Sequence, residues 1–128
     1  EDVLSCRGLE RVYQWHATKA GAPTERHAAD IMAACDTGQD ELAAATVATF
    51  VRILGTVCGN LALVHLPFGG LYLIGGVARA MTPHLQTFGF TEAFRDKGRF
   101  AGFMQNFAIH IVEDDYAALT GLVSHLEN

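Results

Sequence analysis

Hydrophobic residues follow a helical spacing along much of this chain, and the spacing is clearest between positions 40 and 64. Apolar side chains recur there every three or four residues, and Arg52 is the one charged residue between Leu42 and Leu66. The pattern predicts one long helix of about 25 residues, close to 40 Å at 1.5 Å per residue. With so few charges, most of its surface is expected to be covered by other elements.

Two glycines lie inside this predicted helix. Gly55 and Gly59 are four positions apart and therefore share one face. Each glycine costs up to about 1 kcal/mol relative to alanine in a helix interior. Close approach of another backbone would explain both, and simple tolerance is the alternative.

Two shorter helices are predicted before the long one. The first covers residues 8–19 and ends at the sequence AGAP, and the second runs from Thr24 as its N-cap to Ala34. Gly38 is expected to break the chain in the turn that follows.

The second half of the chain is predicted to alternate between strands and helices. Leu71–Ile74 reads as a short buried strand and residues 106–112 as a second one. His110 falls within the alternation of the second strand, which favours a structural role over metal binding.

Three helical segments complete this half. They are residues 77–85, interrupted near Pro83, a helical turn in residues 91–100 that is closed by Gly98, and residues 114–126. Two strands alone make a poor sheet, so the missing strands are expected from elsewhere. The abrupt, already periodic start at Glu1 likewise suggests a piece of a longer chain.

Composition narrows the class of protein. The chain has 128 residues, of which 50% are hydrophobic and 18% charged, and its net charge is −5. This suits one globular domain, and the absence of a Lys/Arg cluster argues against nucleic acids and anionic membranes as partners. The apolar region 61–77 is broken by His65, Pro67 and two glycine pairs, so it does not predict a transmembrane helix.

The cysteines and histidines indicate neither disulfides nor metal. Cys6, Cys35 and Cys58 form no CxxC pair, and the six histidines are scattered. Free thiols in a reducing cytoplasm are the simple interpretation, and no metal site is predicted.

A diglycine stands where the first strand meets the next helix. Gly75 and Gly76 would leave backbone N–H groups exposed with no side chain in the way. Such a corner holds an anion or lets a flat ring lie over the backbone. A plain tight turn is the alternative.

Around this corner the sequence resembles a known family. FGGLYLIGGVARAM, followed by FRDKGRF and IVEDDYAALTGL, is similar to the C-terminal part of the bacterial glucokinases. EDVLSCRGLERVY resembles the family's segment E-x-V-L-S-G-P-G-L-x-x-x-Y, and GTVCGNLAL resembles its long helix before the adenosine strand. The resemblance covers essentially the whole chain.

The resemblance implies an α/β fold, namely the mostly helical C-terminal part of an actin-like ATPase domain of the ribonuclease H-like kind. Residues 1–128 would be the C-terminal part of the large domain, with two short strands and a long central helix. The small domain, the phosphate-binding segments and the catalytic base of the family lie upstream and have no counterpart here.

The resemblance also implies an activity and a set of contacts. Family members transfer phosphate from ATP, with Mg²⁺, to the 6-hydroxyl of glucose, and they are commonly cytoplasmic homodimers. Glu1 matches the glutamate that binds sugar hydroxyls, and Gly75, Gly76 and Val77 match the adenosine segment. Mg²⁺ would be held mainly by the upstream part.

This chain departs from the family pattern at two places. Ser5, Cys6 and Arg7, followed by Gly8, stand where the family has Ser-Gly-Pro-Gly near the nucleotide, and Met32 stands where a threonine is common. Arg7 either pairs with a phosphate or points into water. These departures bear on nucleotide affinity more than on the fold.

The sequence therefore predicts part of an ATP-dependent glucokinase that is inactive alone, with exposed apolar surface where the upstream half would pack. A non-catalytic nucleotide- or sugar-binding or assembly module derived from a sugar kinase is the alternative. A kinase for another hexose is a third reading that these residues do not decide.

Overall fold

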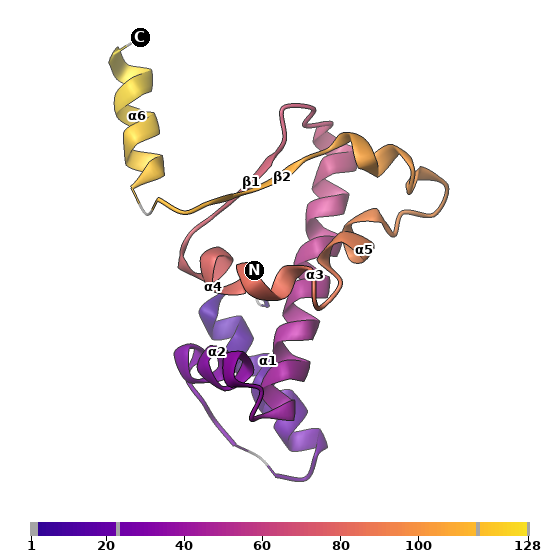
Figure 1. The fold of residues 1–128 in the computed structure, drawn as a ribbon, viewed down its shortest axis with the longest axis vertical. Helices are drawn as coiled ribbons and strands as arrows, with labels where there is room; N and C mark the ends of the chain where they lie inside the picture. Colours follow the sequence, from indigo (N-terminus) through magenta and orange to yellow (C-terminus); the bar gives the residue numbers. More distant parts are fainter. Residues whose placement is uncertain (1–2, 23, 115, 128) are drawn as a thin grey trace.

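The computed structural model describes residues 3–22, 24–114 and 116–127 (Figure 1). Its elements in chain order are α1 (Cys6–Lys19), α2 (Ala28–Thr37), α3 (Glu41–His65), β1 (Leu71–Ile74), α4 (Gly76–Leu85), α5 (Phe90–Arg95), the 3₁₀ turns η1 (Gly98–Phe100) and η2 (Phe103–Asn106), β2 (Ile109–Val112) and α6 (Ala117–Glu127).

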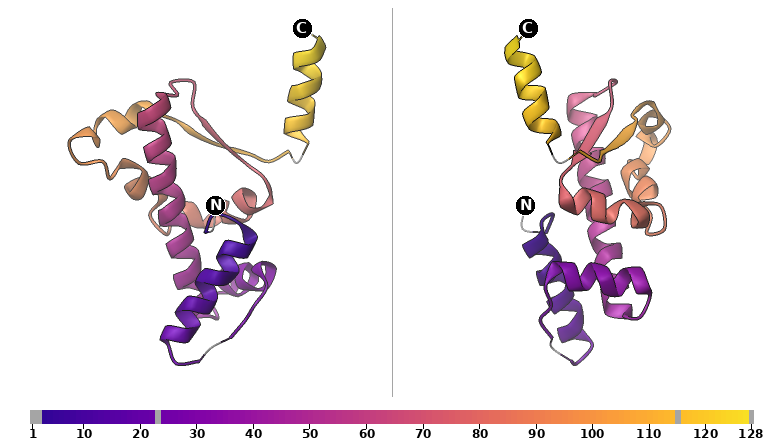
Figure 2. Two further views of the ribbon diagram at one scale, coloured as in Figure 1. Left: turned by 180° about the vertical axis from the view of Figure 1, so that it is seen from behind. Right: turned by 60° about the vertical axis from the view of Figure 1, so that its left-hand side comes forward.

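The long helix α3 is the axis of the molecule, as the spacing predicts. Asp40 caps its start by accepting a hydrogen bond from the Leu42 amide at 2.9 Å. Leu66 ends it in the left-handed region at φ 48°, directly before Pro67. Helices α1 and α2 pack along the first half of α3 and α5 along the second half (Figure 2).

Coverage of α3 is incomplete toward its C-terminal end, so the expectation that most of its surface is covered holds only for the first part. Val57, Leu61 and Val64 form an exposed strip there. By length and composition alone, α3 is also long and apolar enough to cross a membrane. A core helix of a globular domain passes the same test, and α3 carries a large share of the core described here.

The two glycines of α3 lie against α5, which confirms the close approach. A Cβ on Gly55 would stand 2.7 Å from the carbonyl oxygen of Phe90, and one on Gly59 would stand 2.6 Å from that of Phe94. Lys97 extends this contact by donating to Asn60 Oδ1 at 2.6 Å. Any larger residue on this face would push α5 away.

The strands β1 and β2 form a parallel pair in which Leu71 aligns with Ile109 and Tyr72 with His110. The rings of Tyr72 and His110 stack at 4.9 Å, in line with a structural role for that histidine. The prediction of a buried first strand is wrong. Tyr72 is 62% and Ile74 49% exposed, because nothing in the described part of the chain covers that face of the sheet.

The start of β2 is also later than expected. The chain from Phe103 to Asn106 forms η2, so pairing begins only at Ile109. The predicted interruption near Pro83 is absent, since α4 continues through it to Leu85.

The start of α2 differs from the prediction for a physical reason. Thr24 does not cap the helix; its hydroxyl donates to the Ala22 carbonyl. Helix α2 begins at Ala28, whose amide donates to Glu10 Oε1 of α1 at 2.9 Å. Gly38 ends α2 at φ 69°, as predicted.

Helix α6 stands apart from the remaining helices at the end of β2 (Figure 2). It begins at Ala117, later than position 114. Its exposed apolar residues are Leu119, Leu122, Val123 and Leu126. Exposed apolar surface of the kind the sequence predicts is therefore present here and on the open face of β1.

Candidate functional site

The diglycine corner is open. Gly75 has φ 110°, a conformation that favours glycine, and a Cβ placed on it would meet none of the described residues within 4 Å. Gly76 begins α4 and is exposed, and no side chain in the described part of the chain caps this helix start. The first amides of α4 therefore have no partner within the helix.

Beside the corner lies an apolar slot of about 230 Å³ between the beginnings of α1, α2 and α4. We call this cavity the base slot, after the nucleotide base that the family resemblance implies near this corner. It is lined by Cys6, Leu9, Ala28, Ala29, Met32, Gly76, Val77, Ala80 and Met81. Pockets for drug-sized ligands measure about 300–1,000 Å³, so the base slot has room for part of such a ligand, such as one flat ring system.

The base slot brings together residues that the sequence connects only through the family resemblance. Cys6, Gly76 and Val77 all line it, and so does Met32, the position of the second departure. Gly75 directly precedes the slot-lining Gly76. Residues more than 40 positions apart thus meet at one cavity.

The nucleotide contacts predicted for Ser5 and Arg7 stay predictions. Ser5 is the N-cap of α1, because its Oγ accepts a hydrogen bond from the Gly8 amide at 2.9 Å. Glu1 lies outside the described residues, so the sugar contact stays a prediction.

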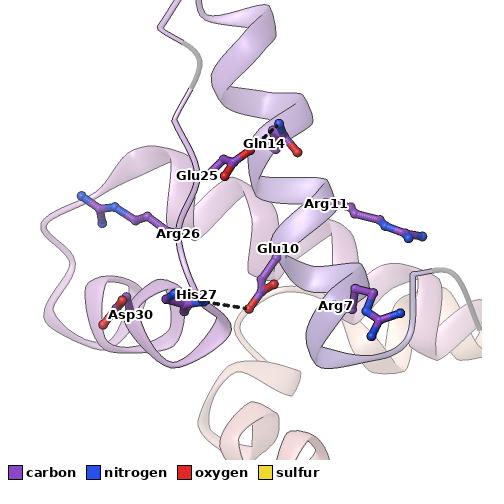
Figure 3. A pocket seen from close by; sticks show the side chains of 8 residues that line it. All are labelled: Arg7, Glu10, Arg11, Gln14, Glu25, Arg26, His27 and Asp30. Carbon is purple, nitrogen blue, oxygen red and sulfur yellow. Dashed lines mark hydrogen bonds and ion pairs between the residues drawn. The ribbon is translucent and has the colours of Figure 1, made fainter.

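Arg7 lines a different cavity, of about 470 Å³, between α1 and the segment leading into α2 (Figure 3). Its lining is highly charged and consists of Arg7, Glu10, Arg11, Gln14, Glu25, Arg26, His27 and Asp30.

Several of these groups already bind one another. Glu10 accepts from the Ala28 amide and lies 3.8 Å from His27 Nδ1, as the dashed line in Figure 3 shows. Gln14 Nε2 donates to Glu25 Oε1 at 3.4 Å. The cavity contains nearly balanced charge, and its contacts tie α1 to α2. We therefore assign it to the scaffold.

A second link between the helices of the base slot was not visible in the sequence. His84 Nε2 of α4 lies 2.6 Å from Asp36 Oδ1 of α2, and its Nδ1 lies 3.9 Å from the sulfur of Cys35. Burial, with the nearby Asp36 charge, raises the pKa of the Cys35 thiol. The thiol is therefore protonated at neutral pH, and the trio holds α2 to α4 rather than acting as a nucleophile.

The described part of the chain has no cluster of metal-binding side chains. Among the described residues, no three His, Cys, Asp or Glu side chains gather so as to hold an ion. The three cysteines are free, with Cys6 exposed and the other two buried.

The base slot and the diglycine corner lie in a chain with clear relatives. A family model described as Glucokinase matches residues 1–128. The chain belongs to the glucokinase family. Glucokinases of Rhizobium etli and Saccharophagus degradans are 35% and 31% identical to it over 126 and 128 residues.

A solved structure agrees with the family. The crystal structure of a glucokinase from an Antarctic psychrotroph has a TM-score of 0.88 and 31% sequence identity over 100% of this chain. The fold is therefore that of the glucokinases, as the resemblance implies. The chain covers 40% of that structure and 37% of the Rhizobium etli relative, so it spans about two fifths of the proteins it matches.

Proposed function

We propose that this chain supplies the adenosine-binding wall of an ATP-dependent glucokinase. The observation that carries the proposal is the open apolar base slot beside a bare diglycine corner. An adenine ring in the slot would contact Met32 and Val77, and the ribose and phosphates would leave past the first amides of α4. Those amides donate hydrogen bonds, which suits an anionic ligand.

Within the complete enzyme, the chain would orient the nucleotide rather than carry out the chemistry. The phosphate loops, the base that deprotonates the sugar hydroxyl and the Mg²⁺ contacts are assigned to the upstream part of the family pattern. Glu1 would add one hydrogen-bonding carboxylate for the sugar. Glucose as the acceptor rests on the family alone.

The proposal is tested by filling the base slot. Ala29 is an exposed residue of α2 that lines the slot, whereas Ala33 is exposed on the same helix and does not line it. Titration with a fluorescent ATP analogue should show a loss of at least about tenfold in affinity for Ala29→Phe, or about 1.4 kcal/mol. Ala33→Phe is the matched control and should bind normally. Equal binding by both variants would place the nucleotide elsewhere.

The non-catalytic module remains the second candidate, and Met32 in the base slot is the observation that favours it. An assay of glucose-dependent ADP release separates the two readings. If the chain is part of a kinase, these residues alone should show no turnover. The longest natural protein that contains them should then show turnover. A longest natural protein that binds nucleotide without turnover would support the module.

A further inference from the structure

We propose that the base slot accepts purine nucleoside triphosphates without distinguishing a 6-amino from a 6-oxo group, so that GTP and ITP bind about as well as ATP. This inference rests on the proposed function, because it concerns which base the same slot holds. It adds a substrate class that the family name does not specify.

The walls of the base slot are apolar. Its side chains are those of alanine, leucine, valine, methionine and one cysteine. A thiol is only a weak hydrogen-bond donor, and a thioether is only a weak acceptor. None of the described side chains in the slot can therefore read the edge of a base.

Polar groups lie at the mouth of the slot, where α4 begins. They include the main-chain amides of that helix start, which have no side-chain cap among the described residues, and the Arg79 guanidinium, whose Nη2 lies 3.9 Å from a Cβ placed on Gly76. The proposed function gives this end of the helix to the phosphates, which every nucleoside triphosphate carries. These groups therefore do not distinguish one purine from another.

Strong selection between two bases requires buried polar groups in the site. A site built to hydrogen-bond a substrate rejects an analogue that lacks the group by about 10⁴–10⁵, because buried polar groups are left unpaired. Among the described residues, the base slot has no buried polar side chain to leave unpaired, so its side chains impose no such penalty. Burial of apolar ring surface remains, and this contribution depends on ring size.

Cys6 provides a direct probe of occupancy. It lines the slot and is exposed, whereas Cys35 and Cys58 are buried. The rate at which a thiol reagent labels Cys6 can be followed by mass spectrometry of its peptide in the presence of ATP, GTP, ITP or UTP. The concentration that halves this rate reports affinity without any need for turnover.

We expect the half-protection concentrations of ATP, GTP and ITP to agree within about tenfold, and UTP, with its single ring, to need at least about fivefold more. A preference greater than tenfold for one purine would overturn the inference while leaving the slot assignment intact. Equal protection by UTP would also overturn it, because the ring would then contribute nothing.

The Ala29→Phe and Ala33→Phe pair separates this inference from the proposed function. Protection by every purine should disappear in Ala29→Phe and persist in Ala33→Phe. If protection is absent from the unmodified chain, or is unchanged in Ala29→Phe, the proposed function fails and the inference falls with it.

Discussion

Asp40 joins three parts of the molecule through one carboxylate. Its Oδ1 caps α3 at the Leu42 amide, and its Oδ2 accepts from the Tyr13 hydroxyl at 2.9 Å and from Arg26 Nη1 at 3.1 Å. Burial alone would raise the pKa of Asp40, but the hydrogen bonds from Tyr13 and the helix amides, with the Arg26 charge, lower it overall. Its ionised form therefore stabilises the fold.

This carboxylate predicts a pH-dependent loss of stability. Asp40→Ala should lower the free energy of unfolding by about 1–3 kcal/mol at pH 7, and Asp40→Asn by less, because asparagine also caps helices. Since the folded pKa is depressed, the contribution is present above the ordinary value of 3.8 and is lost as the pH falls through the folded pKa. Urea unfolding at pH 7 and pH 3 should show the gap between wild type and Asp40→Ala narrowing in acid. An equal difference in unfolding free energy at both pH values would argue against stabilisation by the ionised Asp40 carboxylate.

The three thiols should differ in reactivity. Burial raises the pKa of Cys58, and burial with the Asp36 charge raises that of Cys35, so both have little thiolate at pH 8. Cys6 is exposed at the start of α1. Under native conditions a thiol reagent should modify one cysteine at least about tenfold faster than the others, and Cys6→Ser should remove that phase. Three similar rates would contradict the burial described here.

At the scale of elements, the contact between α3 and α5 depends on two missing side chains. Gly59→Ala should lower the free energy of unfolding by about 1–3 kcal/mol through overpacking, despite a gain in helix propensity of about 1 kcal/mol. Gly121→Ala in α6 is the matched control, because its Cβ would meet none of the described atoms within 4 Å. Thermal unfolding of both variants should show a lower melting temperature for Gly59→Ala alone. A stable Gly59→Ala chain would mean that α5 does not pack this closely.

Elements that depend on residues nearby in the sequence could be predicted, whereas elements that depend on contacts with residues far along the chain could not. The spacing of apolar residues gives α3, and the four-residue interval of Gly55 and Gly59 indicates the close approach of α5. The start of α2 was missed because its first amide bonds to Glu10, 18 positions away.

The candidate site shows the same division. The diglycine corner is visible in the sequence as glycines between a strand and a helix. The base slot is built by three helix starts, and only the family resemblance connected Cys6 and Met32 with Val77. The link from His84 to Asp36 crosses 48 positions and has no sequence signal.

For the whole molecule, the unpacked surfaces are the main feature. None of the described residues of α6 belongs to the buried core, and the outer face of β1 is open. We propose that the remainder of a full-length glucokinase covers both surfaces, and that the homodimer predicted from the family forms through the complete protein.

This view predicts self-association of the 128-residue chain when it is studied alone. Sedimentation at increasing concentration should show species larger than the monomer, because exposed apolar faces attract one another. Replacing Leu119, Leu122 and Leu126 by serine should reduce association with little change in melting temperature. A strictly monomeric wild-type chain would contradict the proposal that these faces need a partner.

A crystal structure of the chain bound to a non-hydrolysable ATP analogue would show directly whether the base slot holds the nucleotide. We expect the adenine ring in the base slot, within about 4 Å of Met32 and Val77, with the phosphates beyond the Gly75–Gly76 corner. A base bound far from that corner, or a slot filled by neighbouring side chains in the bound state, would contradict it.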